Sequence, residues 1–314
     1  MAGSDAAVTV LLIVLWYGSS MLAITTSKLT MQMLKVPLTL CSAQFLSATT
    51  VAGLVLRLQG RPCAVERKSF GVLGGVAITY TLGFFFTNLA FSLANASFVE
   101  TVKAGEPIST VILAFALLGE REGTSTYASL LPVVLGVGMA SSGEAGGGLD
   151  AFLATVGSNF GFSARAVFAK QLKRDFPTSP AAASDVCLFF HISWIGLLGL
   201  LPLACLSEGA TLRAALGGGG AGEFDVGRFL SVMGLNGLMY TAYNQFSFMV
   251  LSRVSTASHA VLNVCRRVCV IAVTTAFFGT PLSMVNMVGV VIAVLGMFWF
   301  THAKTRKVEE KKKA

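Results

Sequence analysis

Long apolar segments without charge recur along the whole 314-residue chain, and they limit its fold more than any other feature. A helix needs about 20 consecutive apolar residues to cross the hydrocarbon core of a bilayer. Such segments lie at 7–27, 38–56, 71–93, 97–118, 126–143, 149–170, 184–206, 229–250, 256–278 and 283–301. They are continuous runs without the alternation of barrel strands, so each is predicted to be a helix. Only 12% of the residues are charged, against about 25% in soluble domains. We therefore predict an all-α polytopic membrane protein with ten transmembrane helices.

The loops between these segments differ in charge. An even number of spans puts both termini on one side, where loops and tail carry fourteen basic residues. They are Arg57, Arg61, Arg67, Lys68, Arg121, Lys173, Arg174, Arg253, Lys304, Arg306, Lys307, Lys311, Lys312 and Lys313. The other side keeps Lys35, Arg213 and Arg228. Because positive loops stay in the cytosol, both termini are predicted to be cytosolic. The net charge of +8 thus follows from topology and does not indicate a nucleic-acid partner.

The two ends of the chain bear on its destination. Residues Met1–Ala6 are short for a transit peptide and contain no arginine, so either a targeting segment is trimmed or none is needed. The final Lys311-Lys312-Lys313-Ala314 resembles a dilysine retrieval signal of the endoplasmic reticulum, and it also fits a plain basic tail.

The six cysteines do not indicate a redox or metal site. They are Cys41, Cys63, Cys187, Cys205, Cys265 and Cys269. Most fall in apolar segments, and none has the spacing of metal ligands. We interpret them as small packing residues. His191 and His259 also lack such spacing, and neither a metal nor a cofactor is expected.

An internal repeat occurs at a constant offset of 160 residues. Tyr80-Thr81 recurs as Tyr240-Thr241, Phe86 as Phe246, and Val134-Leu135-Gly136 as Val294-Leu295-Gly296. Each half then holds five spans, at residues 1–147 and 148–303, followed by a basic cytosolic tail at 304–314. Because five is odd, the second half crosses the membrane in the opposite sense, which is the inverted-repeat plan of secondary transporters.

Ionisable residues inside the spans point to a binding site. They are Glu100, Lys103, Glu106, Arg165, Arg266 and Arg267. A lysine or arginine at the centre of a span costs about 2.5–3.5 kcal/mol on insertion, so these side chains should face water or a partner. Glu100, Lys103 and Glu106 are spaced by three and share a helix face, where Lys103 can pair with either carboxylate.

Four cations against two carboxylates leave a surplus of positive charge that suits an anionic ligand. Arginine offers a planar fork to phosphate oxygens and lysine a point charge, so the combination favours phosphate. Tyr243 and Thr87 are candidate hydroxyl donors beside this cluster. Whether Glu100 and Glu106 titrate or only pair with Lys103 stays open, and with it proton coupling.

Two segments resemble the signatures of plastid phosphate translocators. The first runs from Thr87-Asn88 through Ser97-Phe98, Lys103 and Glu106-Pro107 to Leu118-Gly119-Glu120. The second runs from Leu251-Ser252-Arg253-Val254-Ser255 through His259, Asn263 and Arg266-Arg267 to Phe278-Gly279-Thr280-Pro281-Leu282-Ser283. The resemblance extends nearly from end to end and is to the triose-phosphate-translocator branch of the drug/metabolite transporter superfamily.

The resemblance implies ten helices in two inverted five-helix repeats, and antiport of a phosphorylated C3–C6 metabolite for inorganic phosphate in a plastid envelope membrane. Carried over by position, it makes Lys103, Arg266 and Arg267 the phosphate ligands, with Thr87 and Tyr243 as accessory ligands. Arg266 stands where the family has lysine, and Phe84 where triose-phosphate carriers have a histidine for the far end of the substrate. Triose phosphate, phosphoenolpyruvate, pentose phosphate and hexose phosphate all stay open, as do the direction of transport and the oligomeric state.

We expect alternating access around a central cavity, in which unpaired cations oppose closure until phosphate binds. The alternative is a nucleotide-sugar antiporter of the endoplasmic reticulum or Golgi with the same fold, which the lysine-rich end would suit. An enzyme is not expected, because no nucleophile with a base appears at convergent positions. A membrane scaffold without transport would leave the buried cations unexplained.

Overall fold

The computed structural model describes residues 2–61, 63–141, 148–217, 224–254, 256–280 and 283–313, and this part of the chain is helical throughout, apart from turns and short connections. The helices are α1 (Ala2–Met33), α2 (Pro37–Leu58), α3 (Phe70–Leu93), α4 (Ala96–Lys103), α5 (Glu106–Leu118), α6 (Thr124–Ser141), α7 (Leu149–Asp175), α8 (Pro180–Ala183), α9 (Asp185–Ser207), α10 (Gly209–Leu216), α11 (Val226–Leu251), α12 (Thr256–Phe278) and α13 (Met284–Lys313). Ser255 and Pro281-Leu282 of the second signature lie outside the described residues, as do the side chains from residue 307 onward.

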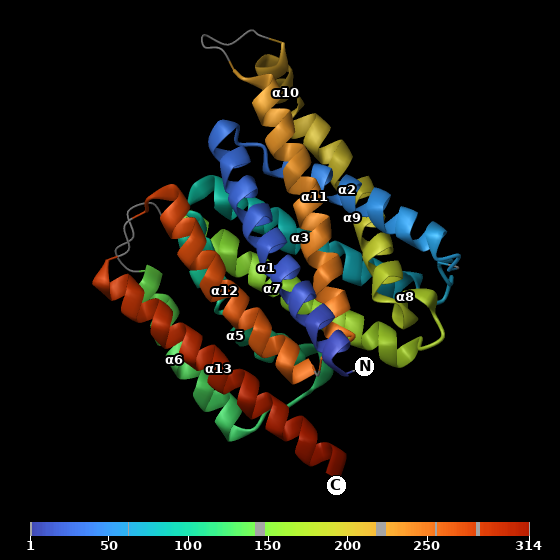
Figure 1. Cartoon of the computed structure of the whole chain (residues 1–314), viewed down its shortest axis with the longest axis vertical. Coiled ribbons are helices and arrows are strands. Elements are labelled where there is room, and N and C mark those ends of the chain that lie inside the picture. Colours follow the sequence, from blue (N-terminus) through green and yellow to red (C-terminus); the bar gives the residue numbers. More distant parts are fainter. Residues whose placement is uncertain are drawn as a thin grey trace.

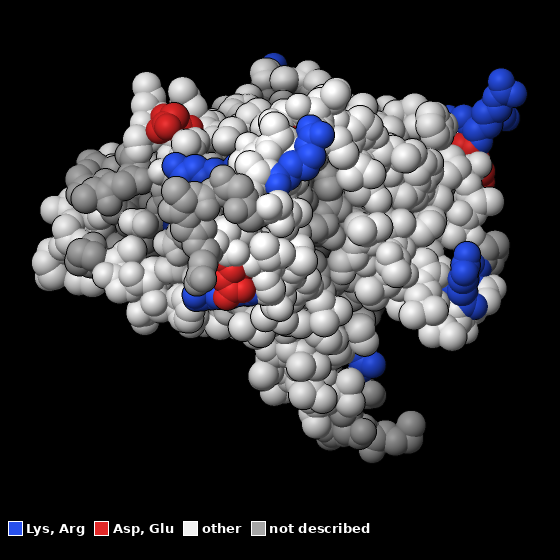
Figure 2. Space-filling view, turned by 90° about the horizontal axis from the view of Figure 1, so that it is seen from above, with Lys and Arg blue, Asp and Glu red and all other residues white. Residues whose placement is uncertain are grey.

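Among the described residues, seven helical segments are long and apolar enough to cross a membrane, which makes the protein a polytopic membrane protein. They are α1, α2, α3, α4 together with α5, α9, α12 and α13. The other three predicted spans coincide with α6, α7 and α11, of which α6 is apolar but shorter. Both chain ends lie towards the lower end of the molecule in Figure 1, and α10 lies at the opposite end. The face nearest α10, seen in Figure 2, carries only scattered charged side chains, both basic and acidic, among its described residues.

The predicted span at 97–118 is confirmed as one apolar segment, but its helix is interrupted and consists of two helices. α4 ends at Lys103 and α5 begins at Glu106. Pro107 lacks an N–H, and in a continuous helix its ring would clash with the carbonyl oxygen of Lys103, four residues earlier. The break therefore puts Lys103 at the end of one helix and Glu106 at the start of the next.

Small residues let several helices pack closely. α6 lies along α13, α3 along α7, α1 along α11 and α2 along α9. Between α6 and α13 the backbones are nearly in contact, since a Cβ on Gly136 would lie 2.3 Å from the backbone nitrogen of Ala293. A Cβ on Gly289 would lie 2.4 Å from the nitrogen of Ala140. This is the close approach that glycine permits between membrane helices.

The interpretation of all six cysteines as packing residues is wrong for two of them. Cys63 and Cys187 form a disulfide, with their Cα atoms 5.8 Å apart. The bond joins the loop after α2 to the first turn of α9. Their separation of 124 residues is the reason that spacing in the sequence did not reveal the pair.

Candidate substrate-binding site

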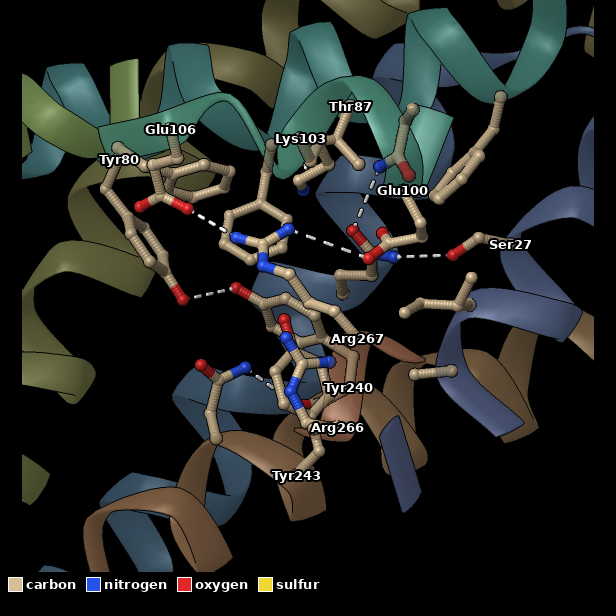
Figure 3. A pocket seen from close by; sticks show the side chains of 18 of the residues that line it. Ser27, Tyr80, Thr87, Glu100, Lys103, Glu106, Tyr240, Tyr243, Arg266 and Arg267 are labelled. Carbon is tan, nitrogen blue, oxygen red and sulfur yellow. Dashed lines mark hydrogen bonds and ion pairs between the residues drawn. The ribbon is translucent and has the colours of Figure 1, made fainter. Parts of the chain in front are cut away.

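A central cavity of about 180 Å³ lies among the helices on which the predicted site residues stand (Figure 3). Its lining includes all of them, namely Thr87, Glu100, Lys103, Glu106, Arg165, Tyr243, Arg266 and Arg267. They come from α3, α4, α5, α7, α11 and α12. The structure thus gathers residues that are up to 180 positions apart in the chain, from Thr87 to Arg267, around one space.

Lys103 contacts a hydroxyl and a ring instead of the predicted carboxylate. Its Nζ donates to Oγ1 of Thr87 at 3.1 Å and lies 4.9 Å from the ring centre of Phe162. The Thr87 hydroxyl in turn lies 2.7 Å from Oγ of Ser158. This buried ammonium group therefore keeps its charge unneutralised by a direct ion pair among the described contacts.

Arg267 takes both carboxylates. Its Nη2 lies 2.5 Å from Oε2 of Glu106, and its Nη1 lies 3.7 Å from Oε2 of Glu100. Figure 3 shows the guanidinium group between the two glutamates. The buried Nη1 and Glu100 Oε2 have no hydrogen-bond partner, so the second ion pair is loose and leaves one donor of Arg267 unused.

Arg266 also faces the cavity, although adjacent residues on a helix point about 100° apart. Its Nε donates to Oδ1 of Asn263 at 3.0 Å, and its Nη1 donates to Oγ of Ser20 on α1. The long side chains of Arg266 and Arg267 thus converge on the same space from different faces of α12. Ser20 was not predicted from the sequence, since a serine in an apolar span usually bonds only its own helix.

Aromatic rings and one arginine form a further part of the cavity wall. Phe84 packs edge-to-face on Tyr80, Phe162 and Tyr240, with ring centres 4.8–4.9 Å apart. The hydroxyl groups of Tyr80 and Tyr240 are 2.7 Å apart. The guanidinium group of Arg165 lies 5.3 Å from the ring centre of Tyr80, and its buried Nε has no hydrogen-bond partner. This part of the wall therefore combines apolar rings with one cationic donor, Nε of Arg165, that has no hydrogen-bond partner among the described residues.

A chain of buried amides that begins in the cavity wall was not predicted. Asn88 Nδ2 donates to Gln44 Oε1 at 3.0 Å, Gln44 Nε2 donates to Asn236 Oδ1 at 2.8 Å, and Asn236 Nδ2 donates to the carbonyl oxygen of Ala23 at 2.7 Å. These bonds connect α3, α2, α11 and α1. Because buried polar groups must be paired, the amides fix the relative positions of these helices. Isolated amides within apolar spans were the available signal in the sequence.

The cavity as a whole is electropositive. When all its charged side chains are ionised, four cations face two carboxylates, and the surplus is two positive charges. In the part of the chain that the structure describes, Arg165 Nε and Arg267 Nη1 are donors without a hydrogen-bond partner. Such a site stabilises a ligand with two negative charges and several acceptor oxygens.

Comparisons with known proteins indicate one family for nearly the whole chain. A family model described as the Triose-phosphate Transporter family matches residues 7–301. Phosphoenolpyruvate/phosphate translocator 2, chloroplastic, of Arabidopsis thaliana is 32% identical over 301 residues, which cover 94% of this chain and 76% of that protein. Triose phosphate/phosphate translocator, non-green plastid, chloroplastic, of Brassica oleracea var. botrytis is 30% identical, over 96% of this chain and 73% of that protein. A solved crystal structure shares the fold, with a TM-score of 0.55 and 16% identity over 95% of this chain and 96% of that chain.

Proposed function

Because the chain belongs to the triose-phosphate transporter family, we propose that it is an antiporter that exchanges a phosphorylated C3–C6 metabolite for inorganic phosphate. Membership of the family makes it a transporter and not an enzyme. Its chloroplast relatives and its seven spanning segments make it a multi-pass protein of a plastid membrane. The observation that carries the proposal is the surplus of two positive charges in the central cavity.

In the proposed bound state the phosphate group lies among Lys103, Arg266 and Arg267, with Thr87 and Tyr243 as hydroxyl ligands. A phosphate monoester carries about −1.5 to −2 charges at neutral pH, which matches the surplus. In the structure Arg267 is already paired with Glu106, contrary to our expectation that the cations of the cavity are unpaired. Two uncompensated charges are left, and closing the cavity around them would cost several kcal/mol. Phosphate removes this cost, so only the loaded carrier should change its orientation.

The part of the cavity wall formed by Phe84 and Arg165 favours a second anionic group and few hydroxyl groups. Arg165 can bind a carboxylate, because its buried Nε is unused. Phe84 offers no hydrogen bond, so a hydroxyl placed against it would lose its partners on leaving water. Phosphoenolpyruvate has a phosphate, a carboxylate and no hydroxyl group, and we propose it as the preferred metabolite. Two relatives that cover most of this chain are named phosphoenolpyruvate/phosphate translocators.

The cavity volume favours a small metabolite over a nucleotide sugar. Pockets for drug-sized ligands measure about 300–1,000 Å³, whereas this cavity measures about 180 Å³. A nucleotide sugar has to place a base, two phosphates and a sugar, so it would need considerable widening of the site. The alternative of an antiporter of the endoplasmic reticulum or Golgi is therefore the weaker hypothesis.

We further propose ten transmembrane helices in two inverted repeats, at residues 1–147 and 148–303. In order along the chain, α1, α2, α3, α4 with α5, and α6 would correspond to α7, α9, α11, α12 and α13. If each helix is replaced by its counterpart, the packed pair α1–α11 becomes α7–α3, and these two helices also pack together. The packed pairs α2–α9 and α6–α13 each become themselves. Tyr80 and Tyr240, which are 160 positions apart, touch each other. These contacts support an internal two-fold axis through the cavity, which suits alternating access.

Counter-exchange of labelled phosphate in proteoliposomes tests the function. Lys103→Ala and Arg266→Ala should each lower exchange at least tenfold, because each removes a charged hydrogen bond worth about 1.5–3 kcal/mol. Lys170→Ala is the matched control, since Lys170 is exposed and pairs with Glu120 outside the cavity. Undiminished exchange in both site variants would overturn the proposed site. A carrier that takes up nucleoside monophosphates in preference to phosphoenolpyruvate would point to the alternative.

Phe84→His tests the proposed substrate. An imidazole at this position supplies a donor or acceptor for a substrate hydroxyl, so exchange of hydroxylated triose phosphates should rise relative to phosphoenolpyruvate. Phe84→Leu keeps the wall apolar and serves as the control. An unchanged ratio of the two substrates in Phe84→His would show that Phe84 does not face the far end of the substrate.

A further inference from the structure

A second reactive site lies away from the substrate cavity, at the Cys63–Cys187 disulfide. Nε2 of His191 lies 3.2 Å from Sγ of Cys63 and 3.0 Å from the carbonyl oxygen of Cys63. Nδ1 of the same ring accepts a hydrogen bond from Nε1 of Trp194 at 2.8 Å. Because Nδ1 is an acceptor, the neutral ring carries its proton on Nε2, facing Cys63. The three side chains Cys63, Cys187 and His191 lie close enough to hold a metal ion, but a protonated Nε2 has no lone pair to bind one.

The two sulfur atoms differ in access. Cys187 is buried, whereas Cys63 is partly exposed and lines a second cavity of about 550 Å³. This cavity lies beside α2 and the loop after it, with Phe190 of α9 on its other side, and two exposed arginines, Arg57 and Arg61, also line it. Its volume is in the range that accommodates a ligand of a few hundred daltons. A reactive sulfur thus stands in a positively charged cavity of ligand size.

We propose that Cys63 is a thiol–disulfide exchange site for a small acidic thiol of the glutathione class. A thiolate of this kind attacks Sγ of Cys63, the Cys63–Cys187 bond breaks, and Cys187 leaves as a thiolate that then takes up a proton. A mixed disulfide now joins the small thiol to Cys63. A second thiolate attacks the sulfur of the bound small thiol, which releases Cys63 as a thiolate and forms the disulfide of the small thiol. Two small thiols are oxidised, and one protein disulfide is reduced to two thiols.

Each leaving sulfur has a group that stabilises its negative charge. Cys187 lies in the first turn of the 23-residue helix α9, where the helix dipole favours a thiolate. The carboxylate of Asp185 in the same turn is partly compensated by Lys173, whose Nζ lies 3.1 Å away. The sulfur of Cys63 shares the Nε2–H of His191 with the carbonyl oxygen of the same cysteine. Since a more stable thiolate leaves faster, both steps of the exchange are favoured.

The carboxylates of the small thiol give Arg57 and Arg61 a role. Both arginines lie in a segment that the charge pattern places on the cytosolic side, where disulfides are usually transient and redox-sensing. The bond connects the loop after α2 to α9, which belong to different proposed repeats. Reversible opening of this bond should change the rate at which the carrier exchanges its substrates. This consequence rests on the proposed function. The exchange chemistry itself does not depend on transport.

The chemistry is tested on the purified full-length chain in detergent. The oxidised protein is incubated with glutathione or with the neutral thiol 2-mercaptoethanol, quenched with a maleimide, and analysed by peptide mass spectrometry. We expect a glutathione mixed disulfide on the Cys63 peptide. Arg57→Gln combined with Arg61→Gln should slow reduction by glutathione about threefold to tenfold, since each exposed ion pair contributes modestly, and leave 2-mercaptoethanol unaffected. Arg67→Gln combined with Lys68→Gln removes the same charge from the same loop outside the cavity, and should change neither rate.

Several outcomes would overturn the proposal. They are an adduct only on Cys205, Cys265 or Cys269, equal slowing of both thiols by the arginine substitutions, and reduction by 2-mercaptoethanol without any by glutathione. Cys187→Ser tests Cys63 without the disulfide. In this variant the thiol of Cys63 is free and should form the mixed disulfide directly with oxidised glutathione, which shows that the site around Cys63 is still folded. His191→Gln should slow release of Cys63 from the mixed disulfide without preventing its formation. If phosphate exchange fails in proteoliposomes while the Cys63 adduct forms, the proposed function is wrong and the exchange site stands.

Discussion

Glu106→Gln tests whether an internal carboxylate competes with the substrate for Arg267. In the structure Oε2 of Glu106 lies 2.5 Å from Nη2 of Arg267, so a phosphate group that uses both terminal nitrogens of the guanidinium group has to displace this contact. The amide of glutamine has the same size and no charge. The substitution therefore weakens the competitor and raises the surplus charge of the cavity from two to three. Phosphate should bind more tightly, and the carrier should turn over more slowly, because one charge is left uncompensated in the loaded state.

The expected magnitude follows from the geometry. A hydrogen bond between charged groups contributes about 1.5–3 kcal/mol, but the side chain of Glu106 is 31% exposed, and water screens part of the interaction. We therefore take about 1–2 kcal/mol, which corresponds to roughly fivefold to thirtyfold tighter phosphate binding.

Two measurements check this prediction. The phosphate dependence of thermal stability in detergent reports affinity, since a ligand stabilises the folded state according to its concentration and Kd. The phosphate dependence of counter-exchange in proteoliposomes reports apparent KM and maximal rate. Glu120→Gln is the matched control, because Glu120 also pairs with a cation, Lys170, but is exposed and outside the cavity. Unchanged or weaker phosphate binding in Glu106→Gln would refute the idea of internal competition.

Two further predictions concern the helices that hold the site. Gly136→Ala should separate α6 from α13 and lower Tm in detergent, by about 2–4 °C for each kcal/mol lost, because the added Cβ meets backbone. Gly138→Ala, where nothing lies within 4 Å, should have little effect. Lys28→Met should also lower Tm, since Nζ of this buried lysine donates to the carbonyl oxygen of Ala94 at 2.6 Å, and an unsatisfied buried carbonyl costs about 1–3 kcal/mol. Lys35→Met, at an exposed lysine, is the control for Lys28→Met. For each pair of substitutions, an equal change of Tm in the variant and in its control would contradict the argument.

The helical segments could be predicted from the sequence because their cause is local. Each predicted apolar segment coincides with a helix or, for 97–118, with two helices. The charged residues that line the cavity could be predicted for a similar reason, since a charged side chain inside an apolar segment is costly to insert into the membrane at any position of the chain. The disulfide was not predictable, because Cys63 and Cys187 are 124 residues apart and each looks like an ordinary small residue in its own surroundings. Lys28 was missed because it lies just beyond the first predicted span, although the structure buries it.

The pairing of charges in the cavity depends on a backbone feature that residue spacing conceals. On a continuous helix Lys103 and Glu106 would lie one turn apart on the same face and would form an ion pair with each other. The break before Pro107 puts them on separate helices, so Glu106 meets Arg267 of α12 while Lys103 turns to Thr87. The ammonium group is thereby kept free of a carboxylate partner within the cavity. The proline that interrupts this membrane helix thus leaves one cation unneutralised for the phosphate group of the proposed substrate.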